Sequence, residues 1–190
     1  MKYKLAALLA VVIGVLTSGQ NTLAQTTPSL NLNQNYIIAG SSKVRPGEIS
    51  SRRINIAGVS LESKMPEVIK LLGKPKQQKV AKGFPAIDGD FVDLFYPGLQ
   101  VRLVTSKPGK LQTGIVYEVI STSSKHTTID GICVGDTIDK VIQKYGTPEE
   151  NVVEGKKYIS YWRKPYGTGG LIFEVKNNVV KQISFRFDPF

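Results

Sequence analysis

The sequence predicts an α+β fold of two tandem repeats, each a helix packed on one face of an antiparallel meander. Three observations predict it: a segment of 18 residues that recurs 73 positions later, apolar stripes at helical spacing, and downstream segments in which apolar and polar residues alternate. The chain has 190 residues, which is enough for one or two domains.

The first 24 residues are expected to be a signal peptide. Lys2 and Lys4 precede an uncharged apolar run from Leu5 to Leu16, and small residues follow up to Ala24. A membrane-spanning helix needs about 20 apolar residues, which is more than this run offers. We therefore expect an exported, periplasmic or secreted protein that begins near Gln25 and has no transmembrane span after cleavage. An uncleaved anchor is the alternative.

The rest of the chain is expected to divide into four parts. Residues 25–53 are a polar and basic lead-in, partly disordered. Residues 54–120 are the first repeat, residues 121–128 a polar linker, and residues 129–190 the second repeat.

The recurring segment encodes a short helix together with its ends. It runs over residues 58–75 and again over residues 131–148. Ser63 and Asp136 are residue types that cap helix N-termini, and in each copy a glycine followed by a proline ends the helix. The apolar stripes are Met65, Val68, Ile69 and Leu72 in the first copy, and Ile138, Val141, Ile142 and Tyr145 in the second.

Alternating segments follow each predicted helix. We expect strands at 91–96, 99–104 and 114–120 in the first repeat, and at 158–162, 171–175 and 181–187 in the second. Alternation with one apolar face indicates an antiparallel sheet that is covered on one side only. It also places Tyr161 and Trp162 on opposite sides of their strand.

This pattern over roughly residues 54–187 resembles the β-lactamase-inhibitor-protein-like fold. A single copy resembles the small lipoprotein of the outer-membrane β-barrel assembly machinery. The resemblance implies a protein that binds other proteins without a cofactor or chemistry. Two departures set limits: Gly19-Gln20-Asn21 stand where a lipoprotein needs its cysteine, and Cys133 has no partner for the disulfides of the secreted inhibitors.

The charge of the chain favours acidic partners. Lysine and arginine number 25 against 15 acidic residues, for a net charge of +10. We therefore expect a protein with an acidic surface or an anionic envelope polymer as the partner. Export argues against nucleic acid. The single cysteine, Cys133, excludes an internal disulfide and is expected to be a small buried group, with an intermolecular pair as the alternative.

No catalytic, cofactor-binding or metal-binding constellation stands out. His126 lies in the predicted linker without a nucleophile placed beside it, and Asp88-Gly89-Asp90 reads as a turn because a calcium loop needs further ligands. We therefore expect a non-enzymatic protein that uses no cofactor. The alternative is an exported enzyme that acts on an envelope polymer, for which a concave acidic pocket would argue. An exposed aromatic sheet face with no pocket would argue for binding.

The candidate binding site lies where the two repeats differ in length. The spacing from Pro75 to Phe95 exceeds that from Pro148 to Tyr161 by seven positions, which places an insertion within residues 81–90. The second repeat has a long hairpin at residues 163–170 instead. Aromatic and basic residues are typical anchors of interfaces. The predicted partner-binding residues are Phe84, Ile87, Asp88, Tyr158, Trp162, Arg163, Lys164 and Tyr166. The function expected is that of a protein-binding module, either an inhibitor or an assembly factor.

Overall fold

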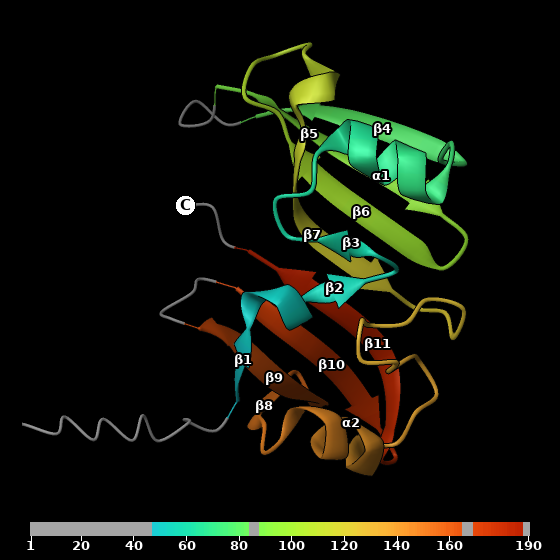
Figure 1. Ribbon diagram of the computed structural model, residues 1–190, viewed down its shortest axis with the longest axis vertical. Helices are drawn as coiled ribbons and strands as arrows, with labels where there is room; N and C mark the ends of the chain where they lie inside the picture. Colours follow the sequence, from blue (N-terminus) through green and yellow to red (C-terminus); the bar gives the residue numbers. More distant parts are fainter. Residues whose placement is uncertain (1–46, 84–87, 165–168, 188–190) are drawn as a thin grey trace, which may run out of the picture. The chain divides into compact units, whose positions relative to one another are not determined.

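The fold is α+β and is dominated by one large sheet (Figure 1). The computed structural model describes residues 47–83, 88–164 and 169–187. The chain divides into two compact units, Met1–Ser41 and Ser42–Phe190, and all described residues belong to the second. In this described part no helix is long and apolar enough to cross a membrane.

The helices and strands of the described residues follow one another along the chain. The helices are η1 (Ser51–Arg53), α1 (Met65–Leu72), η2 (Leu111–Thr113) and α2 (Ile138–Tyr145). The strands are β1 (Glu48–Ser50), β2 (Asn55–Ile56), β3 (Val59–Ser60), β4 (Gln77–Lys82), β5 (Asp90–Tyr96), β6 (Leu99–Val104), β7 (Ile115–Ser121), β8 (Glu149–Val153), β9 (Lys156–Lys164), β10 (Gly170–Lys176) and β11 (Val179–Arg186).

The strands of both halves join in one nine-stranded sheet. Its order is β1-β9-β10-β11-β7-β6-β5-β4, and β8 pairs with β9 beside β1. We expected a separate sheet for each repeat, but β7 and β11 pair antiparallel through Val119 and Phe185 and make the sheet continuous. Pairing removes two open edges whose backbone groups would otherwise need another partner.

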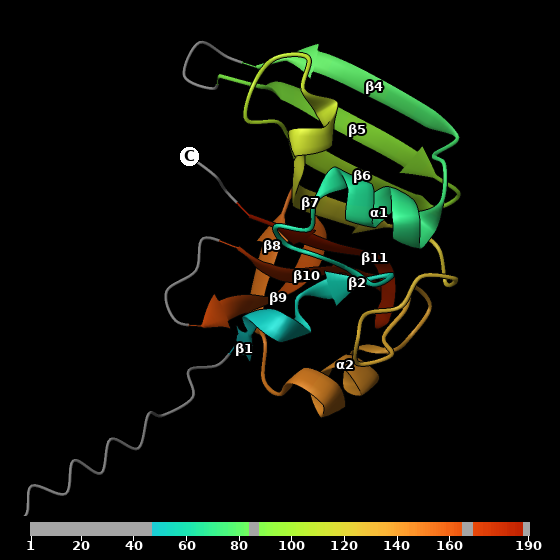
Figure 2. The same cartoon turned by 45° about the horizontal axis from the view of Figure 1, so that its top comes forward.

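The two α-helices have the predicted positions and the predicted C-terminal ends. Each has eight residues and is followed by a glycine with positive φ, Gly73 at 77° and Gly146 at 84°. Positive φ favours glycine, and it turns the chain out of the helix. Figures 1 and 2 show α1 lying across β5 and β6.

The N-caps are one residue later than predicted. Lys64 and Thr137 are the N-cap residues, and the Thr137 hydroxyl accepts a hydrogen bond from the Lys140 backbone N–H. Ser63 and Asp136 instead stabilise the turn that leads into each helix. The Ser63 hydroxyl accepts from the Ser60 N–H at 3.1 Å, and the Asp136 carboxylate accepts from the Cys133 N–H at 2.8 Å.

The main core lies between the sheet and the helices. One lateral row of buried side chains crosses six strands through consecutive register partners: Leu94, Val101, Val119, Phe185, Leu171 and Tyr161. Val68 of α1 and Val141 and Tyr145 of α2 belong to the same core. Ile142 does not, since 36% of it is exposed, which corrects its place in the predicted stripe.

Residues 48–53, expected in the lead-in, belong to the fold. β1 pairs in parallel with β9, and Ile49 is buried. Arg53 lies 4.5 Å from the centre of the Tyr145 ring and its Nε is 3.0 Å from the Asp130 carboxylate. The predicted linker is also anchored, because Thr128 is buried and its hydroxyl accepts hydrogen bonds from Tyr145 and from the Ile132 backbone. Residues 48–53 and 121–128 are too short to show a periodic pattern, so the sequence did not predict that they belong to the fold.

Candidate functional site: the open face of the sheet

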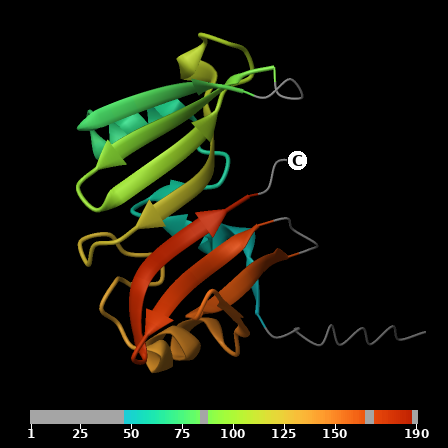
Figure 3. The ribbon, with the colours of Figure 1, turned by 180° about the vertical axis from the view of Figure 1, so that it is seen from behind.

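One face of the sheet is left without a helix over it in the described part of the chain (Figure 3). Successive residues of a strand point to opposite faces, so every strand that buries one row of side chains toward α1 and α2 presents the next row on the other side. We call this second surface the open face. Its side chains are mostly half-buried rather than fully exposed.

A row of side chains crosses eight strands of the open face, and polar and apolar residues alternate along it from β4 to β9. Its members are consecutive register partners: Gln77, Phe95, Gln100, Ile120, Ser184, Ile172, Ser160 and Glu149. Neighbours on adjacent strands lie close enough to form one continuous contact surface. A shallow hollow of about 220 Å³ lies along this row, beside Phe95, Gln100 and Ile120.

A second row on the open face carries charges of alternating sign. From β4 to β11 its members are Lys79, Asp93, Arg102, Glu118 and Arg186. Arg102 is the centre of the row, and its guanidinium donates to Asp93 at 3.0 Å and to Glu118 at 2.7 Å. Only 8% of Glu118 is exposed, so Arg102 neutralises a carboxylate that is largely withdrawn from water.

The surroundings of Arg102 fix its charge and its position. Burial lowers the pKa of Arg102, but the hydrogen bonds that the guanidinium donates to Glu118 and Asp93 outweigh that effect and raise the pKa above its ordinary value. The guanidinium also lies 5.6 Å from the centre of the Tyr117 ring. Burial raises the pKa of Tyr117, which keeps the phenol neutral. The centre of the open face is therefore a fixed cation between two anions, packed on an aromatic ring.

The second half of the open face contains most of the predicted site residues that are described. Trp162 donates its indole N–H to Glu149 at 2.6 Å. A Cβ at Gly170 would lie 2.9 Å from Trp162 Cε3, so the glycine leaves room for the ring. Tyr158 lies four residues before Trp162 on the same face of β9, in register with Glu174. The Lys164 ammonium is 3.2 Å from the Glu48 carboxylate.

The remaining predicted residues do not join this surface. Phe84, Ile87 and Tyr166 lie outside the described residues. Asp88 is exposed at the end of the β4–β5 hairpin. Arg163 lies on the other side of β9, where its guanidinium is 3.7 Å from Glu62 and 5.4 Å from the centre of the Phe187 ring.

The segment 81–90, predicted as a binding loop, is partly strand. Ala81 and Lys82 belong to β4, and Asp90 begins β5. Asp90 is buried, its carboxylate accepts a hydrogen bond from the Gly109 N–H at 2.7 Å, and its backbone N–H donates to the Thr105 hydroxyl at 2.7 Å. The Asp90 carboxylate therefore holds the segment after β6 in place. In the described part of the chain, no group of three or more His, Cys, Asp or Glu residues could hold a metal ion.

Cys133 is half-buried, where a fully buried thiol was expected. Burial and the Asp136 carboxylate raise its pKa, which keeps the thiol protonated and weakens it as a nucleophile. His126 lies 2.9 Å from the Pro97 carbonyl oxygen and serves as a contact between the 121–128 segment and the β5–β6 turn.

Sequence reasoning missed two features of the surface. An apolar hollow of about 440 Å³ lies between α1 and η2, lined by Met65, Pro66, Ile69, Lys70, Leu111 and Gln112. The charged row on the open face is the other. Its members are far apart in sequence, and only the pairing of five strands brings them together.

Comparison of the sequence with protein-family models and with curated proteins finds no match. Two solved structures are similar at low identity. One is an extracellular protein containing an SCP domain from Bacillus anthracis, with 8% identity and a TM-score of 0.41, over 67% of this chain and 44% of that one. The other is a DUF4309 family protein (YjgB) from Bacillus subtilis, with 14% identity and a TM-score of 0.37, over 75% of this chain and 88% of that one. This chain thus spans less than half the length of the first.

Proposed function

We propose that this chain is an exported, non-enzymatic protein-binding module and that the open face of the sheet is its binding surface. The observation that carries the proposal is the row from Gln77 to Glu149, which crosses eight strands without a helix over it among the described residues. A surface that alternates apolar and hydrogen-bonding side chains can exclude water and still satisfy polar groups of a partner.

The shape of this face favours a macromolecule over a small ligand. Its hollow beside Phe95 and Ile120 measures about 220 Å³, below the roughly 300–1,000 Å³ of usual small-molecule sites. Arginine, tyrosine and tryptophan are the usual anchors of protein interfaces, and Arg102, Tyr158 and Trp162 lie on this face. Hydrogen bonds to neighbouring carboxylates hold Arg102 and Trp162 in place before any partner binds.

The tandem-repeat reading is part of this proposal, and matching contacts in the two halves support it. Tyr96 donates its hydroxyl to the Gly73 carbonyl, and Tyr161 donates to the Gly146 carbonyl. Lys64 forms a bridge with Ile115, and Thr137 forms one with Val179, so each N-cap is tied to the last strand of its half. A scaffold in which one unit is used twice doubles the length of the sheet without a new core design.

Three isoleucine-to-arginine variants test the open face. Ile120→Arg and Ile172→Arg place a charge in the middle of the polar–apolar row, and Ile142→Arg places one on α2, where the native side chain is 36% exposed. We expect the chain to capture a protein from the envelope or secreted fraction of its host, and the two open-face variants to lose that capture while Ile142→Arg retains it. The melting temperature of each variant is measured alongside. Equal capture by all three folded variants would reject the open face as the site.

A further inference from the structure

β4 ends the sheet on one side and has no partner on its outer side among the described residues, whereas β1 and β8 are the edge strands at the other end (Figure 2). It pairs antiparallel with β5 from Gln77 to Lys82. The Gly83 N–H donates to the Gly89 carbonyl, so these two residues form a hydrogen-bonded pair. Such pairs alternate along an antiparallel ladder, so Ala81, Lys79 and Gln77 are also hydrogen-bonded to β5. The backbone N–H and C=O groups of Gln78, Val80 and Lys82 consequently point away from the sheet.

β4 is also exposed along its whole length. All six side chains are exposed, and 50% of Val80 is accessible even though its neighbour across the pair, Val92, is fully buried. A strand added beside β4 would cover Val80 and continue the backbone ladder. Pairing by main-chain hydrogen bonds provides affinity, and alternate side chains provide specificity.

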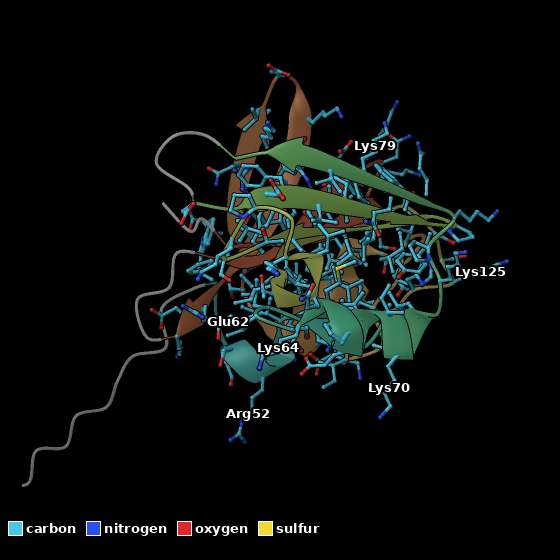
Figure 4. All side chains as sticks on the ribbon, turned by 90° about the horizontal axis from the view of Figure 1, so that it is seen from above. Arg52, Glu62, Lys64, Lys70, Lys79 and Lys125 are labelled. Atoms are coloured by element: carbon cyan, nitrogen blue, oxygen red, sulfur yellow. The ribbon has the colours of Figure 1, made fainter. Side chains whose placement is uncertain are left out.

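The charges of this edge are basic and unmatched. Lys74, Lys76, Lys79 and Lys82 fall within nine residues, and no acidic residue occurs from Gly73 to Ile87. The described carboxylates form no ion pair with these four lysines; Lys79 instead lies 5.4 Å from the centre of the Phe95 ring. Figure 4 shows Lys79 and Lys70 pointing outward on opposite sides of the sheet.

The edge strand β8 shows that this charge is particular to β4. β8 is equally exposed, but its acidic residues have partners: Glu149 accepts from Trp162, and Glu150 is 2.8 Å from the Lys157 ammonium. A second copy of this chain is a poor occupant for β4. Antiparallel pairing of β4 with itself would bring the lysines of both copies together, and β8 has no free acid at those two positions to offer.

We propose that β4 is a docking edge that adds an extended acidic strand of a partner protein to the sheet. It rests on the proposed function only in that both make the chain a protein-binding module. The docking edge consists of the outward backbone groups of β4 and Val80, and only Gln77 and Lys79 of this strand also belong to the two rows of the open face. Lysines on an edge strand also prevent uncontrolled pairing between copies. The same lysines that repel a second copy attract a strand with alternating carboxylates, and this gives the edge its specificity.

The test measures strand addition directly on the full chain. The probe is a fluorescent peptide of about eight residues in which glutamate alternates with valine or threonine. One control peptide replaces glutamate with lysine, and another keeps every glutamate but replaces the valines and threonines with proline. Binding is followed by fluorescence anisotropy, and amide hydrogen exchange reports on Gln78, Val80 and Lys82. We expect the acidic peptide to bind, to protect those three amides and to weaken with salt, and we expect both control peptides to bind at least about tenfold more weakly.

Variants of the edge complete the test. Val80→Pro removes an outward N–H without removing one from the β4–β5 ladder, and Val80→Thr keeps it. We expect the proline variant to lose about tenfold in affinity and the threonine variant to stay within about twofold. Equal binding of the proline-rich acidic peptide, or no protection of the three amides, would overturn strand addition. Trp162→Ala should bind the peptide normally, so failure here and failure of the open-face proposal are distinguishable.

Discussion

The two halves of the sheet place similar helices in similar positions but bury them to different extents. In α2 three residues are buried, Ile138, Val141 and Tyr145, whereas in α1 only Val68 is. Tyr145 packs on Tyr161 and Phe173 at 5.1 and 5.9 Å between ring centres. Leu72 occupies the corresponding place in α1 and is only partly buried.

The difference in helix burial indicates which half contributes more to the stability of the fold and which half leaves more of its surface exposed. The second half also receives Arg53 and Thr128 against Tyr145, so its helix is covered from several sides. The first half keeps an apolar hollow beside α1, and the lysines of its exposed strand β4 have no acidic partner among the described residues, whereas the acidic residues of the equally exposed β8 are paired. We infer that the second half anchors the fold, and that the first half contributes more of its surface to contacts with other molecules.

The largest difference in stability between the two halves is expected at the corresponding positions Tyr145 and Leu72. Tyr145→Ala removes a buried ring from an aromatic cluster and should lower the free energy of unfolding by about 3–5 kcal/mol. Leu72→Ala should cost about 1 kcal/mol, because its side chain is already partly in water. Chemical denaturation measures both. Equal costs would show that the two helices are anchored equally.

A second prediction compares neighbours within α2. Val141 is fully buried and Ile142 is 36% exposed. Val141→Ala should lower the free energy of unfolding by about 2 kcal/mol, and Ile142→Ala by less than about 1 kcal/mol, although isoleucine loses more atoms. Denaturant titration of the two variants under one set of conditions checks the order. A larger cost at Ile142 would mean that the helix is rotated from the position described.

A third prediction concerns alkaline pH. Burial raises the pKa of Tyr145 and of Tyr161 well above their usual value near 10. Above pH 10 these phenols ionise in the unfolded chain but stay protonated in the folded one, so the folded state binds more protons and stability falls as pH rises. Tyr161→Phe should remove its share of that slope, on the order of 1 kcal/mol between pH 10 and 11. Thermal unfolding from pH 8 to 11 measures it, and parallel curves for wild type and variant would contradict the prediction.

The smallest expected effect on stability concerns the hydroxyls of Tyr96 and Tyr161, which donate hydrogen bonds to the carbonyls at the C-terminal ends of the two helices. Tyr161 is fully buried, and Tyr96 is partly exposed. Tyr161→Phe leaves the Gly146 carbonyl without this donor and should cost about 1 kcal/mol, and Tyr96→Phe about 0.5 kcal/mol because water can replace it at Gly73. Melting temperatures near neutral pH report the difference. A greater loss at Tyr96 would reverse the ranking of the two halves.

Periodicity predicted those elements that have one buried face. Both α-helices and the six strands β5–β7 and β9–β11 have such a face, and their positions follow from the pattern. β4 and β8 were missed because every side chain in them is exposed, so no alternation marks them. The shifted N-caps have a local cause, since Ser63 and Asp136 use their side-chain oxygens in the preceding turns.

The candidate site was predictable only where its residues are neighbours in sequence. Tyr158, Trp162 and Lys164 alternate along one strand, and the sequence is sufficient to group them. Arg102 and its partners Asp93 and Glu118 come from three strands, so their contact depends on register. The pairing of β7 with β11 is a tertiary event between half-buried edges, and no local pattern records it.

Site-specific photo-crosslinking tests the central claim most directly. A photoreactive amino acid replaces Ser184, which lies in the middle of the open face, or Leu71 on α1, which is 54% exposed and serves as the control away from that face. We expect that illumination of the chain in its native compartment links Ser184 to one protein partner and that Leu71 yields none or far less of the same product. Crosslinking to that partner from Leu71 and not from Ser184 would contradict the account.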